Sequence, residues 1–297
     1  MPNNITVARA YVQIVPSAEG IKGSITSALG GEASSAGSQL GSILSTGIKG
    51  AVVAGVAGLG AIIGGALTEG GALQQSLGGV ETLFKDSAGQ VIAAANEAYR
   101  TAGVSANSYM EQVTSFSATL LQGLGGDTAA AASYADKAIV QMSDNANKMG
   151  TSMESLQSAY QGFAIVNYTM LDNLKLGYGG TQAEMARLIN DSGVLGDSIE
   201  VTAETVKDVP FSSIIDAIQV IQDNLGITGT TAKEAATTLT GSFASVKAAL
   251  SNVLAGLALG QDLGPALNAL SSTLSTFLSG NLIPALFNIL SALPARW

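Results

Sequence analysis

The stretch DTAAAASYADKAIVQMSDNANKMGTSME, residues 127–154, contains the end signals of two consecutive helices. Asp127 precedes an alanine-rich run, and its carboxylate suits the N-cap position, where it accepts hydrogen bonds from free helical amides. Gly150 closes the run, because glycine adopts the left-handed conformation of a helix C-terminus without steric cost. Thr151 and Glu154 then have the Thr-x-x-Glu spacing of a capping box, which marks the next helix start.

Similar signals recur along the chain. Two further capping boxes are Thr181 with Glu184 and Thr231 with Glu234, while Ser105 precedes a helix that stops at Gly125 and Gly126. Apolar residues at helical spacing fill the segments between such signals. They are Leu73, Leu77, Val80 and Phe84; Val91, Ile92, Ala95 and Tyr99; Tyr109, Met110, Val113, Phe116 and Leu120; and, after Pro210, Ile214, Ile215, Ile218, Val220 and Ile221. One more continuous helix is predicted from about Ala232, carrying Leu239, Phe243, Val246, Leu250, Val253, Leu254 and Leu257.

These patterns predict an all-α fold, an elongated or loosely packed helical bundle that includes one Gly/Ala-rich hydrophobic helix. At most one short N-terminal strand is expected, over the alternating residues Ala10–Val15 before Pro16. No long alternating run follows Pro16, which argues against a substantial sheet. Aromatic residues make up 5% of the chain, so the core is expected to consist of Ala, Leu, Val and Ile with little rigid shape.

The composition excludes several classes of chemistry. The 297 residues include no histidine and no cysteine, which removes imidazole bases, thiolate nucleophiles, disulfides and the common zinc sites. The net charge of −9 disfavours binding to nucleic acid phosphates, so no sequence-specific nucleic acid binding is expected. We therefore predict no catalytic site, no cofactor and no metal, and the chain is not expected to be an enzyme.

The glycine clusters and isolated carboxylates agree with this prediction. Gly58-x-Gly60, Gly123-x-Gly125-Gly126 and Gly177–Gly180 match neither a dinucleotide-binding fingerprint nor a P-loop. Glu154, Glu184 and Glu234 stand at capping positions, where a structural role is favoured. Thr228–Thr231 could hold an anion at a helix start, but an ordinary N-cap is the simpler interpretation.

One uncharged segment, residues 50–68, has the length of a membrane-spanning helix. Gly60-x-x-x-Gly64 has the small-residue spacing that lets two apolar helices approach closely in lipid. Two interpretations stay open: a buried, close-packed helix in an oligomer, and conditional insertion into a membrane. The residues expected to make helix-packing or membrane contacts are Val52, Gly55, Val56, Gly60, Ile62, Ile63, Gly64 and Leu67.

The C-terminal region offers a second apolar candidate. No charge occurs from Leu263 to Ala295, and residues 282–290 form an apolar run in which Pro284 suits the first turn of a helix. We expect four regions. They are an N-terminal strand and Ser/Gly/Ala-rich segment (1–46), a hydrophobic Gly-rich helix (47–68), a helical region (69–260) and an uncharged hydrophobic C-terminal segment that is expected to be truncated (261–297).

Six strings in the same order resemble the N-terminal region of tail tape measure proteins from long-tailed bacteriophages and prophages of Gram-positive hosts. They are AYVQIVPSAEGIKGSI (10–25), GGVETLFKDSAGQVI (78–92), SANSYMEQVTSFSATLLQGLGG (105–126), SDNANKMGTSMESLQSAYQGFA (143–164), NYTMLDNLKLGYGGT (167–181) and GITGTTAKEAATT (226–238). Residues 69–260 would then be the conserved tape-measure region.

The resemblance implies a virion component without enzymatic activity. Several copies would lie in the lumen of the tail tube and form coiled coils, and their extent would set tail length. The implied partners are further copies of the chain, the tail tube protein, tail assembly chaperones and distal tail or tail-tip proteins. The protein would occupy the host cytoplasm during assembly and the virion tail afterwards, and would contact the host membrane during genome ejection.

The sequence departs from that family in two respects. A fully helical chain of 297 residues would span only about 450 Å, which is short for a ruler and indicates a fragment or short form. Ile165 and Val166 stand where relatives commonly have a polar pair, which indicates either drift or a buried contact. The alternative function is a membrane-active, pore-forming helical protein without a ruler role.

Overall fold

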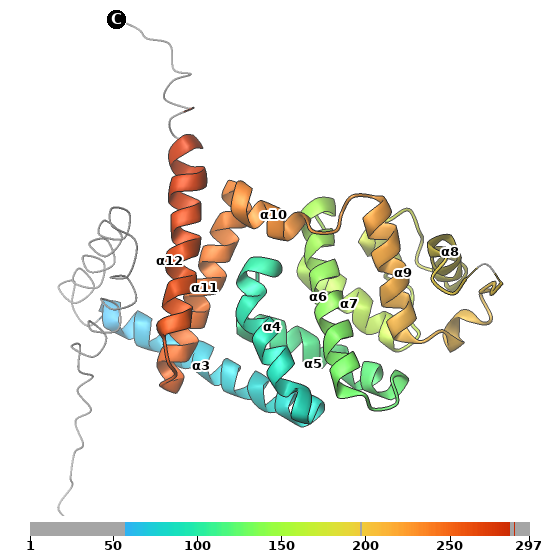
Figure 1. The fold of residues 1–297 in the computed structure, drawn as a ribbon, viewed down its shortest axis with the longest axis horizontal. Helices are drawn as coiled ribbons and strands as arrows, with labels where there is room; N and C mark the ends of the chain where they lie inside the picture. Colours follow the sequence, from blue (N-terminus) through green and yellow to red (C-terminus); the bar gives the residue numbers. More distant parts are fainter. Residues whose placement is uncertain (1–56, 197, 286–287, 289–297) are drawn as a thin grey trace, which may run out of the picture.

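The computed structural model describes residues 57–196, 198–285 and 288, and Figure 1 shows their arrangement. These residues form helices and no strand, which confirms the all-α prediction for this part of the chain. The α-helices are α3 (Ala57–Phe84), α4 (Ala88–Thr101), α5 (Ala106–Gly123), α6 (Thr128–Met149), α7 (Met153–Ala164), α8 (Gln182–Ser192), α9 (Phe211–Asn224), α10 (Thr230–Thr237), α11 (Leu239–Leu259) and α12 (Gly264–Ser275). Short 3₁₀ segments are η1 (Lys85–Ser87), η2 (Leu171–Leu174) and η3 (Val206–Asp208), and η4 (Thr276–Leu282) is a π-helix.

The N-terminal predictions fall largely outside the described residues. The possible strand at 10–15 and the segment 1–46 lie there entirely. Helix α3 begins at Ala57 and continues through residues 68 and 69, between which the sequence placed a boundary. The division into four regions therefore stays a prediction, as does the elongated packing of the bundle.

Three of the predicted helix starts are confirmed. The Ser105 hydroxyl accepts a hydrogen bond from the amide of Ser108, and the Asp127 carboxylate accepts two, from Ala129 and Ala130. Thr181 caps α8 by accepting from the amide of Glu184. The predicted stop at Gly150 is confirmed as well, since this residue has a φ of 69°.

Two of the predicted capping boxes are wrong. In each, a residue from a distant segment forms a hydrogen bond that replaces the predicted cap. Ser152 caps α7, because the Thr151 hydroxyl instead donates to the carbonyl of Asn173, 2.8 Å away. Helix α10 begins at Thr230, two residues earlier than predicted, with Gly229 at the N-cap position. Its free amides are satisfied by a carboxylate from α6 and not by a threonine of its own first turn.

The helix predicted from Ala232 onward is divided into α10 and α11. Thr238 separates them in an extended conformation, and its hydroxyl caps α11 by accepting from the amide of Gly241. A side chain at position 241 would collide with the carbonyl of Glu234, so glycine permits this close turn. Near the C-terminus the helical backbone continues from η4 through Pro284. The helix start predicted at Pro284 is therefore not separate from η4.

The core contains more aromatic residues than the composition suggested. The largest fully buried side chains include Tyr109, Tyr160, Phe84 and Phe163. Phe116 meets Phe211 edge to face, with ring centroids 6.0 Å apart. The expectation of a core without rigid shape was wrong for the part between α3 and α9, because most of the few aromatic rings present are concentrated there.

Helix α6 runs through the middle of the bundle (Figure 1). Four of its residues between positions 141 and 145 are polar and buried. We refer to Gln141, Ser143, Asp144 and Asn145 as the polar hub. Because successive helical residues are rotated by about 100°, these side chains point toward different neighbours. The hub therefore connects α6 with several elements at once.

Each hub residue contacts a different part of the chain. Gln141 donates to the carbonyl of Ile215 in α9 and accepts from the phenol of Tyr160 in α7. Ser143 donates to the carbonyl of Ala102 after α4, and Asn145 donates to that of Leu174 in η2. Asp144 accepts from the amides of Gly229 and Thr231, at 2.7 and 2.8 Å, and so caps α10 from 85 residues away.

Replacing Asp144 by alanine is expected to destabilise the protein by about 3 kcal/mol, because two amides at the start of α10 lose a charged acceptor that is itself buried. Asp144→Asn keeps one acceptor oxygen and should cost roughly half as much. Urea unfolding followed by circular dichroism measures both values. Asp86→Ala, at an exposed carboxylate, is the matched control. A loss for Asp144→Ala no larger than that of the control would show that the cap contributes nothing.

Candidate interaction surface

The eight residues predicted to make packing or membrane contacts are only partly covered by the structure. Val52, Gly55 and Val56 lie outside the described residues. Gly60, Ile62, Ile63 and Gly64 belong to the helical backbone of α3, but the surroundings of their side chains are not described, so their contacts stay predictions. Leu67 is described, and 65% of it is exposed.

A close helix contact occurs one to two turns after the predicted pair of glycines. Gly70 of α3 lies so near Ala258 of α11 that a Cβ on Gly70 would overlap with the Ala258 side chain. Ala66, four residues earlier, is buried, and the Ser251 hydroxyl donates to the Glu69 carboxylate beside this contact. The sequence contains the same small-residue spacing at Ala66-x-x-x-Gly70. Because Glu69 ends the uncharged segment 50–68, the sequence does not single out this pair.

Helix α11 is oriented against the usual pattern, because it buries small residues and exposes large ones. Its buried positions are Ser242, Ser245, Ala248, Ala249, Ala255 and Gly256. The main neighbours of α11 are α3 and α12; Ala255 lies beside Gly70 of α3, and Gly256 lies beside Leu263 at the start of α12. Close packing by small residues lets the three helices approach one another, and it leaves the larger apolar side chains of α11 on the outside.

The exposed side of α11 has a regular spacing. Leu239, Phe243, Leu250 and Leu257 are 43%, 50%, 45% and 37% exposed. Together with the partly exposed Val246 and Val253 they recur at alternating intervals of four and three residues. We call the six residues Leu239, Phe243, Val246, Leu250, Val253 and Leu257 the α11 stripe.

Covering the α11 stripe would lower the free energy of the protein, because its apolar side chains would leave water. Fully burying a leucine or phenylalanine contributes about 1.5–3 kcal/mol, so covering the exposed part of each of the four large residues would contribute about 1 kcal/mol. Contiguous apolar surface of this kind marks interaction sites on soluble proteins. Among the described residues, α11 is also the one helix whose length and composition would allow it to cross a membrane, although 33% of its apolar window is buried inside the protein.

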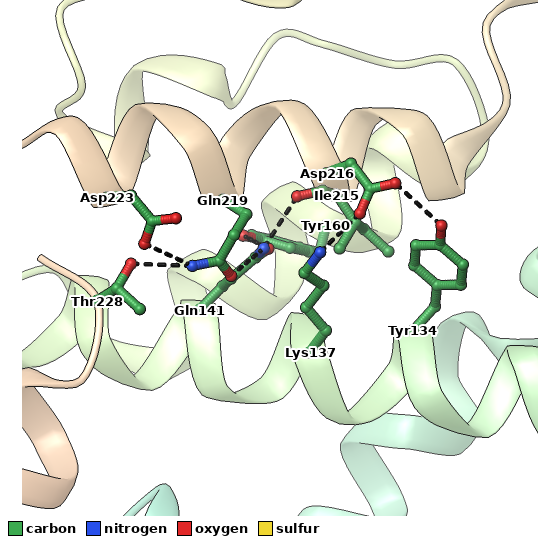
Figure 2. A network of polar contacts seen from close by, with 9 residues as sticks. All are labelled: Tyr134, Lys137, Gln141, Tyr160, Ile215, Asp216, Gln219, Asp223 and Thr228. Carbon is green, nitrogen blue, oxygen red and sulfur yellow. Dashed lines mark hydrogen bonds and ion pairs between the residues drawn. The ribbon is translucent and has the colours of Figure 1, made fainter. Parts of the chain in front are cut away.

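A second candidate site is the polar groove between α6 and α9, with a volume of about 540 Å³ (Figure 2). The Lys137 ammonium lies 2.6 Å from one oxygen of Asp216, and the Tyr134 phenol donates to the other at 2.9 Å. Both carboxylate oxygens are therefore engaged. Further along, the amide of Gln219 donates to Asp223 and to Thr228. This arrangement holds two helices together, and its charged groups already satisfy one another.

The tyrosines of this region are held in the protonated form. Burial, and next the charge of Asp136, raise the pKa of Tyr109 well above its ordinary value of 10.0. Burial also raises the pKa of Tyr160 and of Tyr134, the latter with a contribution from Asp216. Each phenol is therefore a hydrogen-bond donor at neutral pH. In the part of the chain that the structure describes, no three carboxylates lie close enough together to hold a metal ion.

The loop after α7 decides one question that the sequence left open. Ile165 is 71% exposed and Val166 41% exposed, so neither residue is buried in the part of the chain that the structure describes. Val166 also has a φ of 63°, a conformation that is unfavourable for a β-branched residue.

Comparison with known proteins gave no relatives: no family model, no curated protein and no solved structure matches this chain.

The contact at Gly70 can be tested against its neighbour in the same helix. Gly70→Ala is expected to destabilise the protein by about 1–3 kcal/mol, because the added methyl group overlaps with Ala258. Gly71→Ala meets no atom within 4 Å and should stabilise α3 by up to about 1 kcal/mol through helix propensity. Thermal unfolding of both variants measures the difference. Equal effects of the two changes would contradict the close α3–α11 contact.

The raised tyrosine pKa values predict loss of stability in alkali. Because the unfolded chain ionises its tyrosines first, stability should not depend on them below about pH 10 and should fall as the pH rises further. The expected slope is about 1.4 kcal/mol per pH unit for each such tyrosine. Urea unfolding between about pH 9 and pH 11 measures it. Tyr109→Phe should reduce the slope by one tyrosine's share, and an unchanged slope would contradict the prediction.

Proposed function

We propose that this chain is a structural protein of a bacteriophage tail, a fragment or short form of a tail tape measure protein. In this role it templates the assembly and length of the tail tube and assists passage of the genome through the host membrane. The six ordered strings that resemble such proteins motivate the proposal. The observation that carries it is the α11 stripe, because an apolar face on a firmly packed helix serves assembly and not chemistry.

The partners in this proposal are further copies of the chain, the tail tube protein, tail assembly chaperones and distal tail or tail-tip proteins. The chain would act in the host cytoplasm during assembly and would then occupy the lumen of the virion tail. Its net charge of −9 fits a location ahead of the DNA, because like charges do not adhere.

A second candidate is a membrane-active, pore-forming protein. The apolar length of α11 and the uncharged segment 50–68 favour it. Against it, α11 carries the half-buried Ser251 and Asn252, whose hydrogen bonds to Glu69 and to the amide of Ala106 attach the helix to the body of the protein.

The two candidates are separated by co-expression and by a leakage assay. A tagged chain, produced together with the products of the genes that adjoin its own, is expected to purify with tube subunits. The same chain should release no dye from vesicles of phosphatidylethanolamine and phosphatidylglycerol.

Dye release that Ile62→Asp or Leu67→Asp abolishes, without any bound tube subunit, would overturn the tape-measure proposal in favour of the membrane-active one. Gly71→Asp, which adds a carboxylate at an exposed position of the same helix, is the matched control for the two added carboxylates.

A further inference from the structure

The α11 stripe has the geometry of a helix-pairing seam. Alternating intervals of four and three residues place Leu239, Phe243, Val246, Leu250, Val253 and Leu257 along one side of the helix, as at the a and d positions of a coiled coil. Such spacing matches the ridges and grooves of another helix. A flat apolar surface would not require it.

Among the described residues the chain covers only one end of the stripe, where the ring centroid of Phe243 lies 5.4 Å from that of Phe277 in η4. The helix is held in this orientation by contacts on its other sides. Gly70 packs against Ala258, and Ser251 donates to Glu69. Asn252 accepts from the amide of Ala106 at the start of α5. Turning the stripe inward would break these contacts, so the exposed side is a property of the folded protein.

Lipid is a poor match for the same surface. Lys247 is exposed next to the stripe, and the back of the helix carries Ser242, Ser245 and Asn252. Moving α11 into hydrocarbon would desolvate this ammonium and remove the hydroxyl partner of the Glu69 carboxylate. A protein surface covers the stripe without either cost.

Charge identifies the partner as a second copy. The chain has a net charge of −9, so most of its surfaces repel one another. Among the described α-helices, only α11 and α12 contain no carboxylate. The stripe is also self-complementary: in an antiparallel pair Leu239 faces Leu257, Phe243 faces Val253, and Val246 faces Leu250 of the other copy. Self-complementarity is what a two-fold symmetric contact requires.

We infer that the α11 stripe pairs with the α11 stripe of a second copy of this chain in a two-helix, coiled-coil-like contact. This inference rests on the proposed function only for the requirement that several copies meet, and it locates where they do so. Covering the four large exposed residues on both copies gives a contact that forms at micromolar concentrations and separates on dilution.

Analytical ultracentrifugation of the full chain tests the contact. The unaltered protein is expected to dimerise, and Leu250→Glu is expected to weaken dimerisation by at least about tenfold. Leu225→Glu is the matched control, because Leu225 is a similarly exposed leucine outside the stripe, at 52% against 45%. Circular dichroism establishes that both variants are folded. A monomeric unaltered chain, or equal weakening by both variants, would overturn the inference.

Cross-linking provides a second readout that does not depend on a disruptive charge. Because the chain contains no cysteine, Val246→Cys and Leu250→Cys each introduce a single thiol. The two variants are mixed and oxidised. Antiparallel helices should give the mixed disulfide dimer, and parallel helices should give the two homodimers. Either result supports the pairing. Leu225→Cys should give neither. Dimers no more abundant than with Leu225→Cys would overturn the inference.

Two further outcomes separate this inference from the proposed function. Stripe-dependent dimers that purify without tube subunits would overturn the tape-measure role and leave the pairing intact. A monomer that still purifies with tube subunits would overturn the pairing alone. Flotation of a monomeric chain with phosphatidylglycerol vesicles, lost in Leu250→Glu, would assign the stripe to lipid and also overturn the pairing.

Discussion

The buried carboxylate of Asp144 anchors the start of α10, the first helix after α9. Its two oxygens accept from backbone amides at the start of α10, a helix of only eight residues that has no side-chain cap of its own. Only Thr238 separates α10 from α11, so the orientation of α10, together with packing against α3 and α12, constrains that of α11. The neighbouring hub residues Gln141, Ser143 and Asn145 bind three other elements. A buried polar group without a partner is costly, so these bonds favour one arrangement of the helices over others.

The two ends of the described chain differ in how they are packed. Between α3 and α9 the core holds large aromatic and aliphatic side chains, with rings such as Tyr109 and Phe163 almost fully buried. Around α11 the buried residues are Ser, Ala and Gly, which permit close approach of helices but contribute little apolar area. The large residues of α11 are left facing solvent. The protein thus combines a well-packed body with a helix that leaves apolar side chains exposed, and we infer that a second copy covers them.

This division suits a protein that acts by assembly. The groove between α6 and α9 has charged groups, but Lys137, Tyr134 and Asp216 neutralise or bind one another (Figure 2). Apart from the contact of Phe243 with Phe277 of η4, the α11 stripe stays exposed or partly exposed among the described residues. A tape-measure component requires contacts between copies and with tube proteins, and the stripe offers one such contact. The all-α architecture is established for the described part of the chain, whereas the tail-assembly role is our proposal.

Local hydrogen bonds made the helix class and many helix ends predictable. Ser105, Asp127 and Thr181 cap helices through amides two or three residues away, and these partners can be identified from the sequence. The candidate site could be predicted only as apolar helical residues from Leu239 to Leu257. The sequence could not indicate that they face solvent, or that Thr231 gives up its cap to Asp144, 87 residues earlier. Burial and hydrogen-bond partners of this kind depend on which distant segments share the same space, and periodicity along one helix does not contain that information.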